Sequence, residues 1–168
     1  MRRHILAGAA IFVLAVLESA LLPRVFGALP RPGLVLIVSS AWAAIRGTEG
    51  IAWAFWGGLV LDGLSALPLG LNTLALMLGN AVGYLASSAQ LPFRWLRVVI
   101  WVAIATMVYH TAVLLVINLS GQTFELARAI GAVIVPLLVI NPALSLLAMA
   151  ALNRLQQRLR TQEQFFGA

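Results

Sequence analysis

The chain has 168 residues, of which 62% are apolar and 10% are charged, and its net charge is +6. A soluble domain is usually about half apolar and a quarter charged, so this composition excludes a soluble globular protein and indicates an integral membrane protein. The basic residues are eleven arginines at the edges of the apolar runs, which argues against a nucleic-acid-binding surface, and the absence of cysteine excludes disulfides and thiolate chemistry.

Six apolar segments predict an all-α integral membrane protein with six transmembrane helices in a single domain over residues 1–168. The expected spans are residues 5–22, 33–45, 51–66, 69–86, 96–119 and 129–152, followed by a polar cytoplasmic tail over 153–168 that extends the last helix. The second and third segments are short. They are either tilted full crossings or a re-entrant pair, and the sequence leaves both alternatives open.

Two prolines predict a bend in the last helix. Proline has no backbone N–H, so Pro136 leaves the carbonyl of Ala132 without its helical donor, and Pro142 does the same to the carbonyl of Leu138. The freed carbonyls allow the helix axis to change direction at these positions.

The arginines predict the orientation of the chain. With six crossings, eight of them fall on the side of both termini: Arg2, Arg3, Arg46, Arg94, Arg97, Arg154, Arg158 and Arg160. Only Arg24, Arg31 and Arg128 fall on the other side. Because cytoplasmic loops carry the excess of basic residues, both termini are expected in the cytoplasm.

Small residues recur four apart on the third and fourth segments. The third carries Ala54, Gly58 and Asp62 on one face, and the fourth carries Ala75, Gly79 and Gly83. Residues at this spacing share a helix face, and small side chains let another backbone approach closely. These positions are therefore candidates for core packing between the two segments or for binding a partner helix.

Two acidic residues lie near the outer ends of their segments. A carboxylate at the centre of a bilayer costs about 2.5–3.5 kcal/mol, so Asp62 must be close to the interface or satisfied by a partner. It either bonds the start of the fourth segment, forms an ion pair with Arg24, Arg31 or Arg128, or contacts a partner or ligand. Glu18 is expected to snorkel to the interface.

Polar residues within the segments are expected to form hydrogen bonds between helices. His110 has no second ligating group at a similar depth on the fifth and sixth segments except Asn141. An interhelical hydrogen bond is therefore expected for His110, and likewise for Asn72 and Asn80. With no nucleophile elbow, phosphate loop or metal-ligand cluster in the sequence, neither enzymatic activity nor a cofactor or metal is expected.

One stretch carries a family resemblance. It includes Arg31-Pro32, Trp42, the run GGLVLDGLS at 57–65, the turn PLGL at 68–71, and Tyr84-Leu85. A glycine-bearing helix that ends in a leucine–aspartate pair and is followed by leucine–glycine resembles the rod shape-determining protein MreD family. The resemblance covers the whole chain in layout and about a third of it in motif. By this resemblance, Gly58, Asp62, Gly70 and Leu71 shape the family core.

The resemblance implies a non-enzymatic scaffold of the bacterial cell-elongation complex in the cytoplasmic (inner) membrane. Such a protein binds the transmembrane helix of MreC and works with RodA, a class B penicillin-binding protein and MreB to organise lateral peptidoglycan synthesis and cell shape. It also implies a fold similar to the substrate-binding component of energy-coupling factor transporters. The alternative is therefore such a subunit for a small, vitamin-type molecule. That function needs a polar cavity near the outer leaflet, for which Asp62, Asn72, Glu18 and Arg31 are the candidates.

Overall fold

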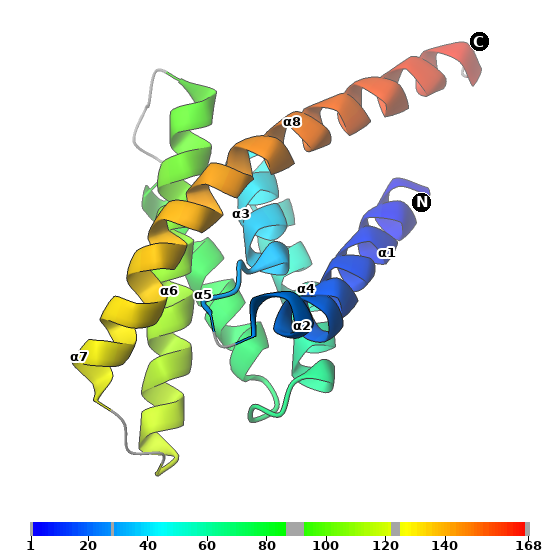
Figure 1. Ribbon diagram of the computed structural model, residues 1–168. Helices are drawn as coiled ribbons and strands as arrows, with labels where there is room; N and C mark the ends of the chain where they lie inside the picture. Colours follow the sequence, from blue (N-terminus) through cyan, green and yellow to red (C-terminus); the bar gives the residue numbers. More distant parts are fainter. Residues whose placement is uncertain (1, 28, 87–92, 122–124, 167–168) are drawn as a thin grey trace.

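The computed structural model describes residues 2–27, 29–86, 93–121 and 125–166. All regular structure in these ranges is helical, which confirms the all-α fold class. Six helical units follow one another along the chain, and Figure 1 shows how they pack. The first comprises α1 (Arg2–Val16), a π-helical turn η1 (Leu17–Leu21) and α2 (Leu22–Phe26). The next are α3 (Leu34–Arg46), α4 (Glu49–Leu64), α5 (Leu71–Ala86) and α6 (Arg94–Leu119). The last comprises α7 (Leu126–Ala129), η2 (Ile130–Ile134) and α8 (Val135–Phe166).

Three helical stretches of the described chain are long and apolar enough to cross a membrane. They are Ile5–Phe26, Arg94–Leu119 and Ala127–Arg154, whereas Leu34–Arg46 and Leu71–Val82 are apolar but shorter. For Leu34–Arg46 the short length has a physical reason, because a helix that is covered by its neighbours does not have to match the ~30 Å hydrocarbon core. A membrane-associated protein follows from the three long helices, and six full crossings stay a prediction.

Helix α3 is the centre of the bundle. It packs against α1, α4, α5, α6 and α8. Nearly every residue from Val35 to Ala44 is buried, including Ser39 and Ser40. Apolar side chains of the surrounding helices, such as Leu76 of α5 and Val102 of α6, complete this core. The protein is therefore arranged as helices around a short buried one.

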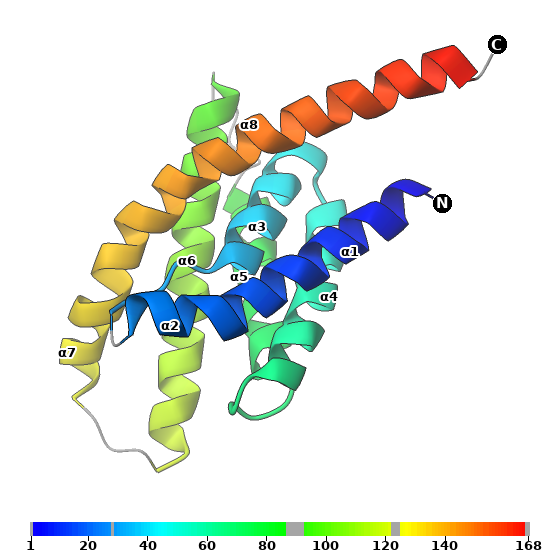
Figure 2. The ribbon, with the colours of Figure 1, turned by 45° about the vertical axis from the view of Figure 1, so that its right-hand side comes forward.

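A π-helical turn precedes a proline in both the first and the last helical unit. In the first unit, Leu22 directly precedes Pro23, and its N–H donates to the carbonyl of Leu17. In the last unit, Val135 directly precedes Pro136, and its N–H donates to the carbonyl of Ile130. The wider turn relieves the contact between the proline ring and the carbonyl four residues earlier. Figure 2 shows that the last helical unit, which contains both Pro136 and Pro142, follows a curved path, and Pro142 lies inside the continuous helix α8.

The small-residue faces of α4 and α5 are packed against this chain's own helices. A Cβ atom on Gly58 would overlap the backbone of Thr73 at the start of α5, and one on Gly79 would lie 2.9 Å from the carbonyl oxygen of Ala105 in α6. Ala54 and Ala75 on the same faces are fully buried. The predicted close packing is therefore present at these positions, with α5 against Gly58 and α6 against Gly79. The third residue of this face, Gly83, lies further along α5, and the structure does not describe its surroundings.

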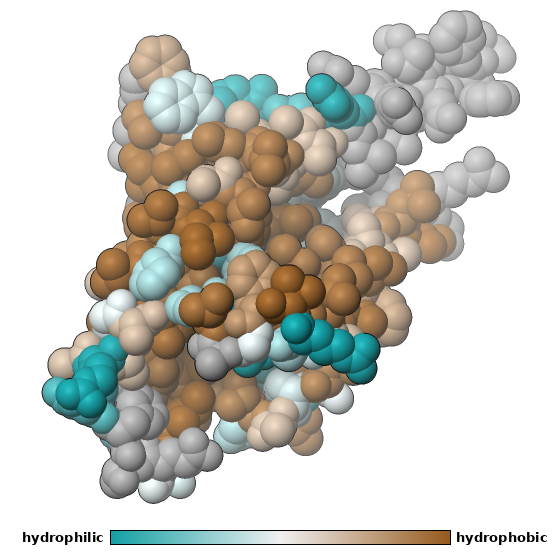
Figure 3. Space-filling view, in the orientation of Figure 1, coloured by the Kyte–Doolittle hydropathy of each residue, from teal (hydrophilic) through white to brown (hydrophobic). Residues whose placement is uncertain are grey.

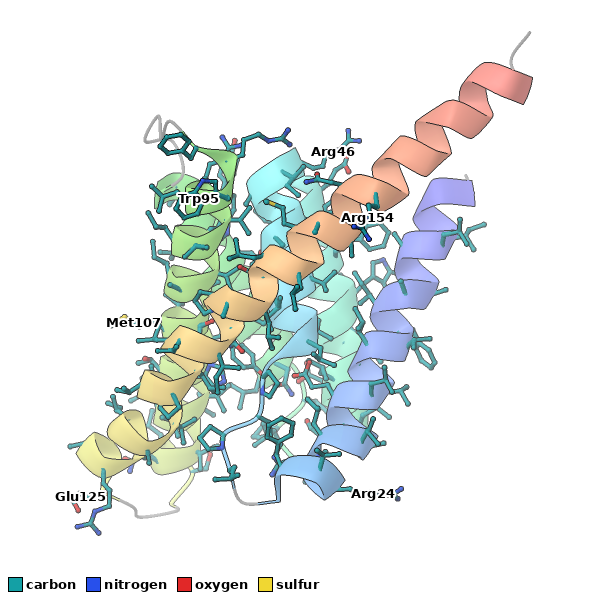
Figure 4. All side chains as sticks on the ribbon, turned by 45° about the horizontal axis from the view of Figure 1, so that its top comes forward. Arg24, Arg46, Trp95, Met107, Glu125 and Arg154 are labelled. Carbon is teal, nitrogen blue, oxygen red and sulfur yellow. The ribbon has the colours of Figure 1, made fainter. Side chains whose placement is uncertain are left out.

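Polar and apolar side chains are segregated along the bundle. Figure 3 shows an apolar belt with hydrophilic side chains gathered towards its two ends. In Figure 4, Arg46, Trp95 and Arg154 lie at one end, and Arg24 and Glu125 lie at the other. Both termini lie on the side of Arg46 and Arg154 (Figure 1). This arrangement is that of a protein whose middle faces lipid and whose ends face water.

The Gly58 contact gives a first prediction. Gly58→Ala should lower the free energy of unfolding by about 1–3 kcal/mol, because the added methyl group meets backbone that cannot move without separating α4 from α5. Gly63→Ala is the matched control in the same helix, since no atom lies within 4 Å of its Cβ position. That control should be neutral or slightly stabilising. Unfolding of the purified protein in detergent measures both, and equal stability of the two variants would contradict the packing.

Candidate functional site

Asp62 caps the beginning of α5 from the end of α4. The carboxylate is 3% exposed and accepts hydrogen bonds from the backbone N–H of Asn72 at 2.8 Å and of Thr73 at 3.1 Å. The Thr73 hydroxyl donates to it at 2.5 Å. The first N–H groups of a helix have no partner within the helix, so a carboxylate here satisfies donors that would otherwise be buried unpaired. The predicted bond to the start of the fourth segment is confirmed.

The predicted ion pair of Asp62 with an arginine is wrong for the described residues. Arg128 instead pairs with Glu125, with 3.1 Å between Nη2 and Oε2. Neither Arg24 nor Arg31 forms an ion pair with Asp62 in the described part of the chain. The backbone donors of α5 already occupy the carboxylate, and they are held in place by the turn that precedes them.

The turn between α4 and α5 positions those donors. Gly70 has a φ of 88°, a left-handed conformation that glycine adopts without steric cost. The N–H of Leu71 donates to the carbonyl of Pro68 at 3.1 Å, and the Leu71 side chain is buried. The residues of this turn therefore reverse the chain so that α5 starts against Asp62.

Glu18 makes the corresponding contact for the central helix. It lies in the π-helical turn η1, and its Oε2 accepts a hydrogen bond from the backbone N–H of Val35 in the first turn of α3 at 2.9 Å. The expectation that Glu18 snorkels outwards is wrong, because the side chain turns inwards to the beginning of a helix. Two acidic residues thus hold the first turns of α3 and α5.

A chain of hydrogen bonds joins α4, α5 and α6 beside Asp62. The Asn72 side chain donates to the Ser65 hydroxyl at 3.1 Å and accepts from the Tyr109 hydroxyl at 2.6 Å. The expected interhelical bonding of Asn72 is confirmed. Sequence reasoning missed the role of Tyr109, since nothing in its neighbourhood along α6 indicates a partner 37 residues away.

A polar pocket of about 220 Å³ lies among these groups. Its lining comes from the first helical unit, the connection to α3, and helices α4, α5 and α6: Glu18, Ser19, Arg31, Pro32, Leu61, Ser65, Leu67, Asn72 and Tyr109. Three of the four residues named for a polar cavity, Glu18, Arg31 and Asn72, line it. Asp62 is not in the lining and lies behind Asn72, to whose backbone it is bonded. The pocket brings an acidic and a basic side chain to one space.

Further polar residues tie the helices together deeper in the core. Asn80 of α5 donates to the Ser39 hydroxyl of α3 at 3.4 Å, and Asn141 of α8 donates to the Thr106 hydroxyl of α6 at 3.2 Å. The interhelical bond expected for Asn80 is confirmed. The one expected for His110 is wrong, because its Nδ1 lies 2.9 Å from the carbonyl oxygen of Thr106 in the same helix.

An apolar groove of about 660 Å³ runs between α1 and α4. It is lined by Ile5, Gly8, Ala9, Ile11, Phe12, Val13, Trp53, Trp56 and Val60. Phe12 and Trp56 are 54% and 59% exposed, so the groove opens on the outer surface of the bundle. The groove was not predicted from the sequence, because it depends on the angle at which α1 crosses α4.

The comparisons with known proteins leave the function to be argued from this geometry. No protein-family model, no curated protein and no solved structure matches the chain. Within the described ranges, no three His, Cys, Asp or Glu residues are grouped so that they could hold a metal ion. The features to be explained are the capped corner at Asp62, the polar pocket and the apolar groove.

The cap at Asp62 gives a second prediction. Asp62→Asn should lower the free energy of unfolding by about 1–2 kcal/mol, because the amide oxygen can still accept from the Asn72 N–H while the amide NH2 group cannot accept from Thr73. Asp62→Ala should cost about 2–4 kcal/mol, since it leaves buried N–H donors of Asn72 and Thr73 unpaired. Glu125→Gln, which removes an exposed ion pair, should cost less than about 1 kcal/mol. Unfolding in detergent measures all three, and an Asp62→Ala variant as stable as the unmodified protein would contradict the cap.

Proposed function

We propose that the chain is a non-enzymatic membrane scaffold of the MreD type, which binds MreC and helps organise lateral peptidoglycan synthesis in the cell-elongation complex. The observation that carries this proposal is the corner between α4 and α5. The motif residues of the resemblance have matching tasks there: Gly58 lets α5 approach, Asp62 caps α5, Gly70 makes the turn and Leu71 fills the core. One motif thus specifies one substructure.

The apolar groove between α1 and α4 is the docking surface that this function would use. Helices in lipid gain no hydrophobic free energy from associating, so a close fit between surfaces must supply the affinity. Gly8 and Ala9 provide a low ridge on α1, while Trp53 and Trp56 form the opposite wall. The occupant proposed for this groove is the single transmembrane helix of MreC, because Gly58 and Gly79 on α4 and α5 are already packed against this chain's own helices. RodA, the class B penicillin-binding protein and MreB would be reached through the assembled complex.

The proposed placement is a bacterial cytoplasmic membrane, crossed six times, with both termini in the cytoplasm. The position of both termini at the end of the bundle that carries Arg46 and Arg154 supports it. Arg24 and the Glu125–Arg128 pair would then face the opposite compartment. This orientation places the polar pocket near the outer surface.

The polar pocket favours a second candidate, the substrate-binding membrane subunit of a small-molecule transporter. Its position near one end of the bundle and its lining by Glu18, Arg31 and Asn72 match what such a subunit requires. Its volume of about 220 Å³ is below the roughly 300–1,000 Å³ of typical sites for drug-sized ligands. A vitamin-sized molecule would not be enclosed, so the scaffold is the better supported function.

Purification of the intact chain from its native membranes, followed by mass spectrometry of what remains attached, separates the two functions. MreC is expected for the scaffold, and an ATPase module would instead support transport. Ala9→Phe, which fills the groove, should reduce the recovery of MreC about tenfold, which corresponds to about 1.4 kcal/mol of binding free energy.

Ala143→Phe is the matched control for the groove. It makes the same change at an exposed position on α8, away from α1 and α4, and should leave recovery of MreC unchanged. Equal recovery from both variants would place the partner elsewhere on the surface. Absence of MreC from the unmodified protein would remove the scaffold proposal itself.

A further inference from the structure

Two opposite charges line the polar pocket without pairing. Glu18 and Arg31 both face this space, and no ion pair joins them in the described part of the chain. Arg31 has no other hydrogen-bond or ionic partner among the described residues. We infer that the pocket is a binding site for a small zwitterionic group, with its ammonium on Glu18 and its anionic oxygens on Arg31. The inference does not depend on which of the proposed functions is correct.

Glu18 retains the capacity to accept a ligand's hydrogen bond. A carboxylate has about four acceptor positions, and the hydrogen bond from the backbone N–H of Val35 uses one of those on Oε2. That bond also fixes the side chain, because α3 is the rigid centre of the bundle. An ammonium group would therefore meet a carboxylate that is already oriented, which lowers the entropy cost of binding.

Arg31 provides the opposite half of the site. It stands in the connection between α2 and α3, next to the buried Pro32, and its side chain is exposed at the rim. A guanidinium presents its donors in a fork that matches the two oxygens of a carboxylate or phosphate. The neutral donors and acceptors of Ser19, Ser65 and Tyr109 complete the lining between the two charges.

Charge balance favours a zwitterion over a simple ion. The two helix N-termini contribute roughly half a positive charge each, and Arg31 adds one, which offsets the carboxylates of Glu18 and Asp62. A ligand with a single charge would engage only one side of the pocket and would change its net charge. A ligand with both charges satisfies both sides and preserves the balance.

The size of the pocket limits the ligand to a small group. A volume of about 220 Å³ corresponds to roughly seven water molecules at about 30 Å³ each. This space holds an amino acid or the phosphoethanolamine headgroup of a phospholipid, and both present an ammonium close to anionic oxygens. The pocket is lined by Glu18 and Ser19 towards the end of the first helical unit and by Ser65 and Leu67 just after α4, and the headgroups of a surrounding bilayer would lie near such helix ends.

The test uses the full chain purified in detergent, with glycine and phosphoethanolamine as soluble zwitterionic probes. Each should raise the unfolding temperature in a saturable way, while ammonium chloride and sodium acetate should do so only at concentrations at least tenfold higher. Arg31→Gln should weaken zwitterion binding at least tenfold. Arg24→Gln removes a neighbouring exposed arginine outside the pocket and should bind as the unmodified protein does.

A second variant separates ligand binding from folding. Ser19→Phe fills the pocket from a side chain that is not part of either helix cap, and it should abolish the shift without lowering the unfolding temperature of the free protein by more than a few degrees. Absence of a saturable shift with both zwitterions, or undiminished binding by Arg31→Gln, would overturn the inference.

Nanodiscs distinguish the two sources of the zwitterion. If a lipid occupies the site, phosphatidylethanolamine should stabilise the protein more than phosphatidylcholine, whose quaternary ammonium has no N–H to donate to Glu18, and Arg31→Gln should remove the difference. If a free amino acid occupies it, the two lipids should be equivalent while the glycine shift persists in both. Either result supports the site and identifies its source.

Discussion

The structure depends on two carboxylates that satisfy the first turns of helices α3 and α5. Apolar contacts alone specify the bundle poorly in lipid, because acyl chains are as apolar as the side chains they replace. Hydrogen bonds are directional, so Glu18 fixes where α3 begins relative to the first helical unit, and Asp62 fixes α5 relative to α4. Glycine contacts then determine how closely the helices approach, as at Gly58.

The polar pocket is a consequence of this capping. Because backbone N–H groups engage both carboxylates, neither is paired with Arg31, which stays at the rim of the pocket that Glu18 lines. Asn72, which donates its backbone N–H to Asp62, also receives the hydroxyl of Tyr109, so the wall of the pocket is continuous with the cap. Groups that stabilise the fold therefore also shape a site.

The sequence predicts the helices well and their contacts unevenly. Long apolar runs place the six helical units, and the cap of Asp62 follows from its short distance to the next helix. The role of Glu18 did not follow, because its partner lies 17 residues away and the widened turn at η1 turns the side chain inwards. Small residues at Gly58 and Gly79 predict a close approach but not which helix approaches. His110 shows the same limit, since an imidazole indicates a bond and not its partner.

The apolar groove and the polar pocket are formed by the same two parts of the chain. The groove lies between α1 and residues 53–60 of α4. The pocket is lined by Glu18, just beyond the end of α1, and by Ser65, just beyond the end of α4. The angle between these helices therefore affects both spaces. A partner helix in the groove and a zwitterion in the pocket would each favour particular angles, and any resulting coupling must be reciprocal, because each ligand changes the affinity for the other by the same factor. A scaffold built in this way would recognise its protein partner within the bilayer and a small polar group at the bilayer's edge through one pair of helices.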